Sequence, residues 1–258
     1  MSGPDLLVER ANGVLRLTFN RPQKRNALNW TIRRALLAEL ASARHDVGIR
    51  VVVLGGDASA FCAGGDVAEM GGGTDEISAM LDAGDAIVSA IRLLPRPVVA
   101  ALRGHVAGAA IGIALACDLV FADRSTTFTP SFARLGIGPD LSASYWLPRQ
   151  VGLLRAKGFL LGGRPIDAVT AAESGMVTEL WESEDFERLL AERVTELATG
   201  PTLAYAAMKQ LLNDSLDRTA AEQAEREKRA QLDLVQSADH LEGVAAFVER
   251  RPARFRGA

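Results

Sequence analysis

Hydrophobic and polar positions follow two different periods along this chain, one typical of strands and one typical of helices. Residues 14–19 alternate apolar and polar side chains and predict the first strand. Residues 49–54 form a nearly continuous β-branched run, which is typical of a strand buried on both faces. Shorter runs predict further strands at 98–102, 119–122, 126–129 and 177–181. Apolar residues with helical spacing predict helices at 28–43, 76–94, 108–116, 153–161, 167–174, 184–198, 201–212, 216–235 and 239–249.

The order of these elements changes near residue 185. Before it, predicted strands alternate with predicted helices, whereas the chain after it is almost wholly helical. We see no disordered linker and no repeat of fixed period. The sequence therefore predicts an α/β fold with a C-terminal helical extension, with the core over residues 1–195 and the extension over residues 196–258.

Composition and charge narrow the class of protein. With 48% hydrophobic and 24% charged residues, the 258-residue chain is typical of a globular protein. Its net charge of −3 provides no overall basic surface for nucleic acid. Residues 1–12 lack the apolar core of a secretory signal, and the longest apolar stretch, 106–117, is too short to span a bilayer. Cys62 and Cys117 show no zinc-ligand spacing and are expected to be reduced core thiols. These features predict a cytoplasmic protein with no metal, membrane segment or nucleic-acid partner.

Two turns of small residues have the pattern of an anion cradle. The segments 60–66 (AFCAGGD) and 104–110 (GHVAGAA) each follow an apolar run and each precede a possible helix. Small side chains expose backbone N–H groups there, and a helix N-terminus adds partial positive charge. Two such amides that converge can hold a carbonyl oxygen that becomes negative during a reaction. Either turn alone is equally compatible with a plain connection.

Five segments in order resemble the enoyl-CoA hydratase/isomerase (crotonase) superfamily. They cover nearly the whole chain: 21–28 (RPQKRNAL), 61–66 (FCAGGD), 103–118, 135–140 (LGIGPD) and 247–255 (FVERRPARF). The resemblance implies a crotonase-like spiral of ββα turns, with a C-terminal helical region that assembles trimers or dimers of trimers. It also implies an acyl-CoA thioester as ligand. No cofactor is expected, because coenzyme A enters as part of the substrate.

The same resemblance assigns roles to individual residues. It implies that the backbone N–H groups of Ala63 and Ala109 form an oxyanion hole for the thioester oxygen. Ala109 stands where the family usually has glycine, but its N–H donates equally well when φ is negative. Removing a proton beside the thioester makes an enolate, whose oxygen this hole stabilises.

Other residues of these segments are expected to contact the ligand. Arg25 matches a position that approaches the coenzyme A phosphates, and Arg250 matches a lysine that often reaches the ligand from a neighbouring subunit. Ala27, Gly65 and Asp66 lie in motifs that line the coenzyme A site. Asp66 reads at the same time as a hydrogen-bonding anchor of its loop.

The two glutamates that family hydratases use are both missing. Gly112 stands at the position of the first and Phe132 at the position of the second. Neither side chain can orient and deprotonate water, so hydration by the two-glutamate route is disfavoured. Glu69, on the loop after the first turn, reads as a solvated surface charge, although it could supply a second proton donor.

One carboxylate remains at a suitable turn. Asp140 precedes residues 141–144, a possible helix start, so it could simply be an N-cap. However, the turn and the following residues 146–149 (WLPR) are similar to phenylacetate-pathway-type isomerases, in which this turn carries the acid/base. Ile111, Phe132 and Trp146 are then candidate walls of the acyl pocket, and apolar walls would raise the pKa of the carboxyl.

The sequence thus predicts an enoyl-CoA double-bond isomerase that moves a proton with Asp140. One alternative is an enoyl-CoA hydratase that uses a non-standard acid or base. Another is a catalytically silent relative that binds acyl-CoA or RNA, although the acidic balance argues against RNA.

Overall fold

A six-stranded sheet forms the centre of the protein, in a computed structural model that describes residues 3–258. Its strand order is β1-β2-β3-β5-β7-β10, and all neighbours are parallel except β1 and β2. The bounds are β1 Leu6–Ala11, β2 Val14–Phe19, β3 Val51–Gly55, β5 Val98–Leu102, β7 Leu119–Asp123 and β10 Glu179–Trp181. The strand predicted at residues 14–19 is confirmed with the same bounds, but it is the second strand of the chain, because β1 precedes it. Asn12 and Gly13 both have positive φ (51° and 80°) and make the two-residue hairpin turn between β1 and β2.

A second, smaller sheet explains how the chain winds. It has the order β4-β6-β8-β9, with bounds β4 Ala60–Cys62, β6 His105–Ala107, β8 Thr127–Thr129 and β9 Ile166–Asp167. The chain runs β3-β4-α2, then β5-β6-α3, then β7-β8 and on to α4. Each turn thus adds one strand to each sheet before a helix, which confirms the predicted spiral of ββα turns. The strands β4, β6 and β9 were not predicted. β4 and β6 lie in segments 60–66 and 104–110, which were assigned to turns, and the two residues of β9 are too few to show a period.

Ten helices complete the described part of the chain. Their bounds are α1 Trp30–His45, α2 Thr74–Leu93, α3 Ala109–Ala116, α4 Ala143–Val151, α5 Leu153–Gly162, α6 Ala168–Ser174, α7 Phe186–Thr199, α8 Thr202–Ser215, α9 Ala220–Leu234 and α10 Ala238–Glu249. All the predicted helices are present, with ends that move by a few residues. Helix α1 begins at Trp30 rather than Leu28, because the Asn29 side chain accepts the N–H of Ile32 at 2.9 Å and caps the helix.

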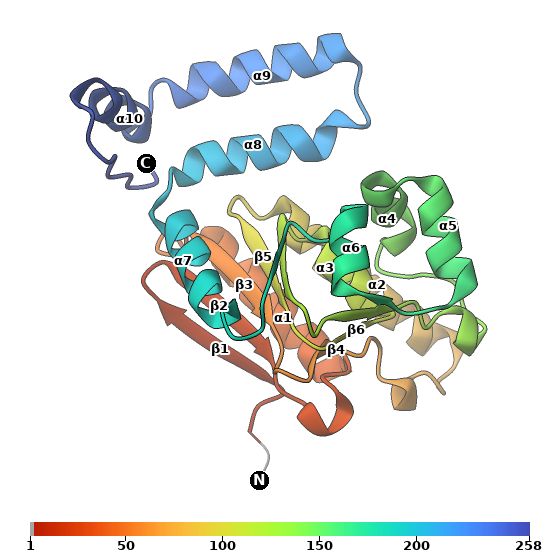
Figure 1. Cartoon of the computed structure of the whole chain (residues 1–258). Coiled ribbons are helices and arrows are strands. Elements are labelled where there is room, and N and C mark those ends of the chain that lie inside the picture. Colours follow the sequence, from red (N-terminus) through yellow and green to blue (C-terminus); the bar gives the residue numbers. More distant parts are fainter. Residues whose placement is uncertain (1–2) are drawn as a thin grey trace.

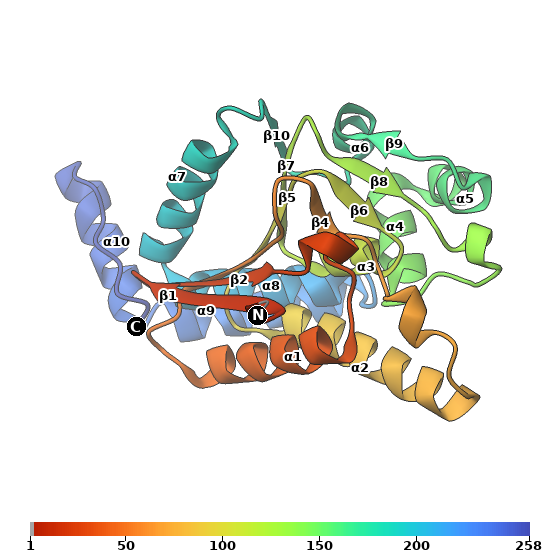
Figure 2. The same cartoon turned by 90° about the horizontal axis from the view of Figure 1, so that it is seen from below.

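Both faces of the large sheet are covered. One face packs on α1, α2 and α3 around a core that includes Leu36, Ile87 and Ile113, and the other packs on α7 through Phe186 and Leu190. Figure 2 shows α1 and α2 on one side of the sheet and α7 on the other. Strand β3 is therefore buried at every residue, as its apolar run predicted.

The helices α8–α10 leave this sandwich as a separate arm. Figure 1 shows α8 and α9 side by side above the sheets, with α10 next to the C-terminus. The predicted boundary at residues 195 and 196 falls inside α7, which packs on the sheet, so the arm begins at α8. Among residues 3–258, no helix is long and apolar enough to cross a membrane.

A buried lysine fastens α8 to the core. The ammonium of Lys209 donates to the carbonyls of Ile91 (2.7 Å) and Arg96 (3.1 Å) and to Asp118 Oδ2 (2.7 Å). The same carboxylate oxygen accepts the N–H of Val98 at 2.7 Å. Asp118 is therefore a structural anchor between two strands and α8, and all three protons of the ammonium have acceptors.

Candidate active site

The two small-residue turns meet because the short strands before them are neighbours. Strands β4 and β6 are parallel and paired, so their carboxyl ends lie at one edge of the small sheet. A Cβ added at Gly64 would lie 2.7 Å from the carbonyl oxygen of Ala107 and 3.3 Å from the nitrogen of Ala109. The φ of Gly64 is +92°, so both its backbone and this close approach require glycine. The convergence that the sequence only suggested is present.

Hydrogen bonds decide which amide of the first turn is free. The N–H of Ala63 donates to the carbonyl of Arg25 at 2.9 Å, so the prediction that Ala63 supplies a free oxyanion donor is wrong. Leu28 donates to Gly64 (2.8 Å) and accepts from Asp66 (3.0 Å). These two bonds make a parallel β-bridge between Leu28 and Gly65. In a bridge of this kind the N–H of Gly65 points away from Leu28. Within residues 3–258 that N–H has no acceptor, so the candidate donor is Gly65.

The second donor lies at the start of α3. Ala109 is the first residue of this helix, and Gly108, with φ +52°, turns the chain into it. The N–H of a first helical residue has no partner inside its helix, and the structure gives that of Ala109 no other acceptor among the described residues. Ala109 is buried, and the helix dipole adds partial positive charge at this end. Gly65 and Ala109 therefore present a pair of free amides at one place.

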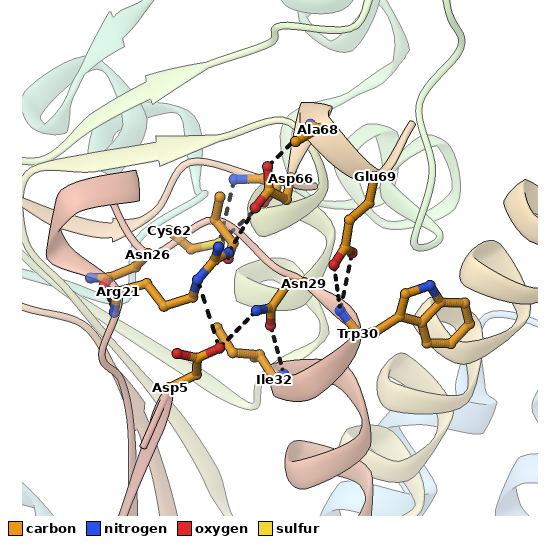
Figure 3. A network of polar contacts seen from close by, with 12 residues as sticks. Asp5, Arg21, Asn26, Asn29, Trp30, Ile32, Cys62, Asp66, Ala68 and Glu69 are labelled. Atoms are coloured by element: carbon orange, nitrogen blue, oxygen red, sulfur yellow. Dashed lines mark hydrogen bonds and ion pairs between the residues drawn. The ribbon is translucent and has the colours of Figure 1, made fainter. Parts of the chain in front are cut away.

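A polar network holds the first turn in shape (Figure 3). The guanidinium of Arg21 forms an ion pair with Asp66 at 2.9 Å and donates to the carbonyl of Ala27 at 2.7 Å. Asp66 also accepts the N–H of Ala68 at 3.1 Å. Burial raises the pKa of Asp66, but these hydrogen bonds outweigh it and leave the pKa below its ordinary value. Both carboxylate oxygens of Asp66 are engaged, as expected of a loop anchor, and Ala27 belongs to the same scaffold.

The preceding turn is also held rigidly. Arg25 and Asn26 have φ of 47° and 59°, in the left-handed region, and Asn26 is fully buried. The Asn26 amide donates to the carbonyl of Ala60 at 2.7 Å and its oxygen accepts the N–H of Arg21 at 2.8 Å. This arrangement places the carbonyl of Arg25 against Ala63. The side chain of Arg25 is exposed, and its contact with coenzyme A stays a prediction.

Glu69 is not the solvated surface charge that the sequence indicated. Its half-buried carboxylate accepts the N–H of Trp30 at 3.1 Å, at the N-terminus of α1 (Figure 3). A carboxylate at this end of a helix is stabilised by the free N–H groups and the helix dipole. Glu69 is thus a helix cap that links the first turn to α1.

The side chain of Asp140 does not cap α4. It lies in the loop between the 3₁₀ turn Ala133–Leu135 and α4. The N-cap residue of α4 is Ser142, and no side chain accepts a capping hydrogen bond from this end of the helix. One carboxylate oxygen, Oδ1, is buried and has no hydrogen-bond partner among the described residues. Burial raises the pKa of Asp140 and nearby Asp85 raises it further, while Arg33 opposes this change; the net shift is upward. A half-buried carboxylate with a raised pKa and a free oxygen is suited to accept a proton.

Leu141 occupies the space that a side chain at position 112 would need. A Cβ added at Gly112 would lie 2.4 Å from the carbonyl oxygen and 2.8 Å from the Cβ of Leu141. Leu141 and Ser142 have φ of 49° and 58°, so the loop adopts a strained left-handed backbone here. The space that a glutamate side chain at position 112 would occupy is therefore filled by the loop that carries Asp140. Phe132, at the second glutamate position, is buried and carries no acid.

The predicted wall residues lie at different depths. Ile111 and Phe132 are buried. Trp146 is half-buried on α4, with the guanidinium carbon of Arg92 3.4 Å above its ring. Leu141 packs on Gly84, and Arg92 follows Gly84 by two turns of α2, about 12 Å along the helix. The roles of these residues as walls of the acyl pocket stay predictions.

Arg33 on α1 is a site residue that the sequence analysis missed. Its side chain is fully buried, and it lies near Asp140, Cys62 and Glu69. A signal was present, because Arg33 falls on the same helix face as Leu36 and Leu40. A charge on an apolar face is the informative exception in such a pattern.

Arg250 lies outside this site within one chain. It is the exposed C-cap residue of α10, and Figure 1 places α10 on the opposite side of the molecule from α4 and β6. A contact with the ligand would thus come from another subunit. Among residues 3–258, no group of three or more His, Cys, Asp or Glu side chains is placed to hold a metal ion.

Comparisons with known proteins confirm the resemblance. The family model described as enoyl-CoA hydratase/isomerase matches residues 9–258. The chain is 39% identical, over all 258 residues of both chains, to a probable enoyl-CoA hydratase of Rhodobacter capsulatus. It is 34% identical to 1,2-epoxyphenylacetyl-CoA isomerase of Escherichia coli, with 95% of each chain covered. The crystal structure of a putative enoyl-CoA hydratase from Streptomyces coelicolor A3(2) superposes with a TM-score of 0.93 at 37% identity, covering 98% of this chain and 94% of that one.

Proposed function

Because the chain belongs to the enoyl-CoA hydratase/isomerase family, we propose that it is an enoyl-CoA isomerase that moves a double bond with Asp140. The observation that supports this choice is the state of Asp140 itself. Its Oδ1 is buried and unpartnered and its pKa is raised, while no second carboxylate stands at position 112 or 132. One base is sufficient for a 1,3-proton shift, whereas two-glutamate hydration requires two acids.

In the proposed reaction, Asp140 takes a proton from C2 of a 3-enoyl-CoA. The electron pair of that C–H bond forms an enolate whose negative charge lies on the thioester oxygen. The N–H groups of Gly65 and Ala109 donate to this oxygen, and the loss of one such donor typically costs about 10²–10³ in rate. Asp140 then returns the proton to C4, and the double bond moves from C3–C4 to C2–C3. The reaction requires no cofactor beyond the coenzyme A of the substrate.

Hydration is the competing function, and the structure offers a reason to place it second. A hydratase of the two-glutamate kind needs a carboxylate on α3, where Leu141 leaves no space for a side chain at Gly112. Phe132 cannot activate water at the other position. A water molecule activated by Asp140 alone is the remaining route to a 3-hydroxyacyl product, and the experiment below detects it.

The test is turnover in deuterated water with a 3-enoyl-CoA and a 2-enoyl-CoA, followed by NMR and mass spectrometry. When the proton on Asp140 exchanges with solvent before it is returned, deuterium enters C4 of the 2-enoyl-CoA and, by the reverse reaction, C2 of the 3-enoyl-CoA. We expect this label and no 3-hydroxyacyl product. Asp140→Asn should lower kcat by about 10²–10⁴, the usual range for loss of a general base. Asp82→Asn, which removes an exposed carboxylate on neighbouring α2, is the matched control and should keep full activity. A hydroxy product, or an unimpaired Asp140→Asn enzyme, contradicts the proposal.

We also propose that the chain assembles as a trimer or a dimer of trimers, as the resemblance implies. Large apolar side chains on the helical arm support this: Leu203, Met208, Leu212, Leu241, Val244, Phe247 and Val248 are all exposed in the single chain. Phe247 is 85% exposed on α10. Light scattering should give a multiple of the 27.5 kDa chain mass, and Phe247→Glu should lower it. A monomeric wild-type protein would exclude this assembly.

A further inference from the structure

A buried arginine beside the proposed base has no full set of partners. The side chain of Arg33 is 1% exposed, although it carries a charge at every accessible pH. Its Nη1 donates to the carbonyl of Met80 at 3.3 Å, and its Nε has no partner among the described residues. Burying a charge in this way is costly unless an opposite charge compensates it. The fold therefore places Arg33 here against its own stability.

The guanidinium lies between the loop of the proposed base and the proposed oxyanion hole. A Cβ added at Gly84 would lie 3.0 Å from Arg33 Nη1 and 2.6 Å from Leu141 Cδ1, so this nitrogen and the side chain of the residue that follows Asp140 both lie against Gly84. A Cβ added at Gly65 would lie 3.7 Å from Arg33 Nη2. One end of the guanidinium thus faces the Asp140 loop and the other faces the turn that carries the Gly65 amide.

Among the charged and titratable groups near Arg33, Asp140 acts on it most strongly. Three groups act on Arg33: Asp140, Cys62 and Glu69. Burial raises the pKa of the Cys62 thiol to about 12, so it stays neutral. The carboxylate of Glu69 acts on Arg33 less strongly than Asp140 does, and it accepts the N–H of Trp30. Asp140 alone has a buried oxygen without a partner.

We propose that Arg33 is a positioning residue. Its fixed positive charge compensates the negative charge that lies on Asp140 before proton transfer and on the thioester oxygen after it. The charge starts on Asp140 and ends on the thioester oxygen held at Gly65, and the two ends of the guanidinium face these two places. Arg33 keeps the buried Asp140 ionised so that it can accept the C2 proton. This inference rests on the proposed function, since it assigns Asp140 as the base.

The titration of Asp140 is a direct readout, because few groups act on it. Arg33 from α1 lowers its pKa and Asp85 from α2 raises it. Helix α3, which packs on Leu141, carries no charged side chain. On α4, the titratable groups are Tyr145 and Arg149, and they stack on each other at 3.4 Å. A change at position 33 therefore reports on the pair itself.

The experiment compares Arg33→Met, which removes the charge, with Arg33→Lys, which keeps a charge. The carboxyl of Asp140 is titrated by ¹³C NMR in aspartate-labelled protein, and its signal is assigned by its absence in Asp140→Asn. The pH profile of kcat/KM is measured in parallel. We expect Arg33→Met to raise the pKa of Asp140, and with it the acid limb of the profile, by about 1–3 units. Arg33→Lys should show less than half of that change. Arg34→Met, an exposed neighbour on α1, is the matched control and should leave both readouts unchanged.

An Asp140 titration that is unchanged in folded Arg33→Met overturns the inference. If that variant does not fold, Arg33→Gln takes its place, and the same upward shift is required. The NMR titration needs no substrate, so it tests the charge pair even if the isomerase proposal fails. Conversely, an enzyme that needs Asp140 but shows no shift in either Arg33 variant keeps the proposed function and rejects this role for Arg33.

Discussion

Adding a side chain at Gly112 should damage the protein rather than restore a hydratase. Gly112→Ala places a methyl group 2.4 Å from the carbonyl oxygen of Leu141, and the obstacle is backbone that cannot rotate away. Such overpacking typically costs about 1–3 kcal/mol. The matched control is Gly158→Ala on α5, an exposed helical glycine whose added Cβ meets nothing within 4 Å. It should gain up to about 1 kcal/mol from helix propensity.

The same intrinsic gain applies to both variants and cancels, so they should differ by the overpacking cost of about 1–3 kcal/mol in the free energy of unfolding. For a chain of this size that difference corresponds to roughly 2–12 °C in Tm. The loop must also shift, and it carries Asp140. A misplacement of about 1 Å at a reacting group can cost about 10²-fold, so isomerase activity should fall with stability in Gly112→Ala.

Thermal unfolding and the isomerase assay measure both effects, and Gly112→Glu completes the series. The glutamate would add a buried carboxylate to the clash, so we expect a lower Tm than for Gly112→Ala and no 3-hydroxyacyl product by mass spectrometry. Equal stability of Gly112→Ala and Gly158→Ala would show that the Leu141 loop yields easily. Hydratase activity in Gly112→Glu would refute the reasoning that the loop has replaced the acid.

Four further predictions follow from the same contacts. Because the pKa of Asp140 is raised and its ionised form is the base, activity should fall on acidification at a pH clearly above the ordinary aspartate value of about 4. Gly64→Ala should lower kcat by about 100-fold or more in the isomerase assay. The φ of Gly64 is +92°, and an added Cβ would displace the turn that carries the Gly65 amide. A variant with unimpaired activity would contradict the proposed oxyanion hole at Gly65 and Ala109. Lys209→Met should lower the free energy of unfolding in urea by about 3–5 kcal/mol, because it leaves the half-buried Asp118 carboxylate without its cation and two carbonyls without this donor. The depressed pKa of Asp66 contributes stability that is present above about pH 4 and lost as pH falls through its folded value, so Asp66→Asn should be less stable at pH 7 and lose less on acidification.

Local patterns of apolar and polar residues predicted most of the helices and strands. The apolar runs of β3 and β5 and the helical spacing of α2 and α8 gave elements whose ends lie within a few residues of the structure. The strands β4 and β6 have three residues each and run directly into the small-residue turns, so their sequence indicates the turns and not the strands. The sequence Asn12-Gly13 is itself a signal for the hairpin of β1 and β2.

The chemistry was determined by the sequence only in part. The absence of acids at Gly112 and Phe132 and the presence of Asp140 can be read directly from the chain, because residue type alone limits what a side chain can do. These three positions, set on the ordered motifs, are the basis of our proposal that a single carboxylate performs the reaction.

Only the tertiary structure decided which groups are free to act. Ala63 and Gly65 are equivalent in the sequence, but the carbonyl of Arg25 takes the first amide and leaves the second without an acceptor. In the same way, Leu141 fills the space beside Gly112, and Arg33 comes to face the loop of the proposed base. Whether an N–H, a carboxylate or a cavity is available depends on contacts between segments far apart in the chain, and no local pattern encodes those contacts.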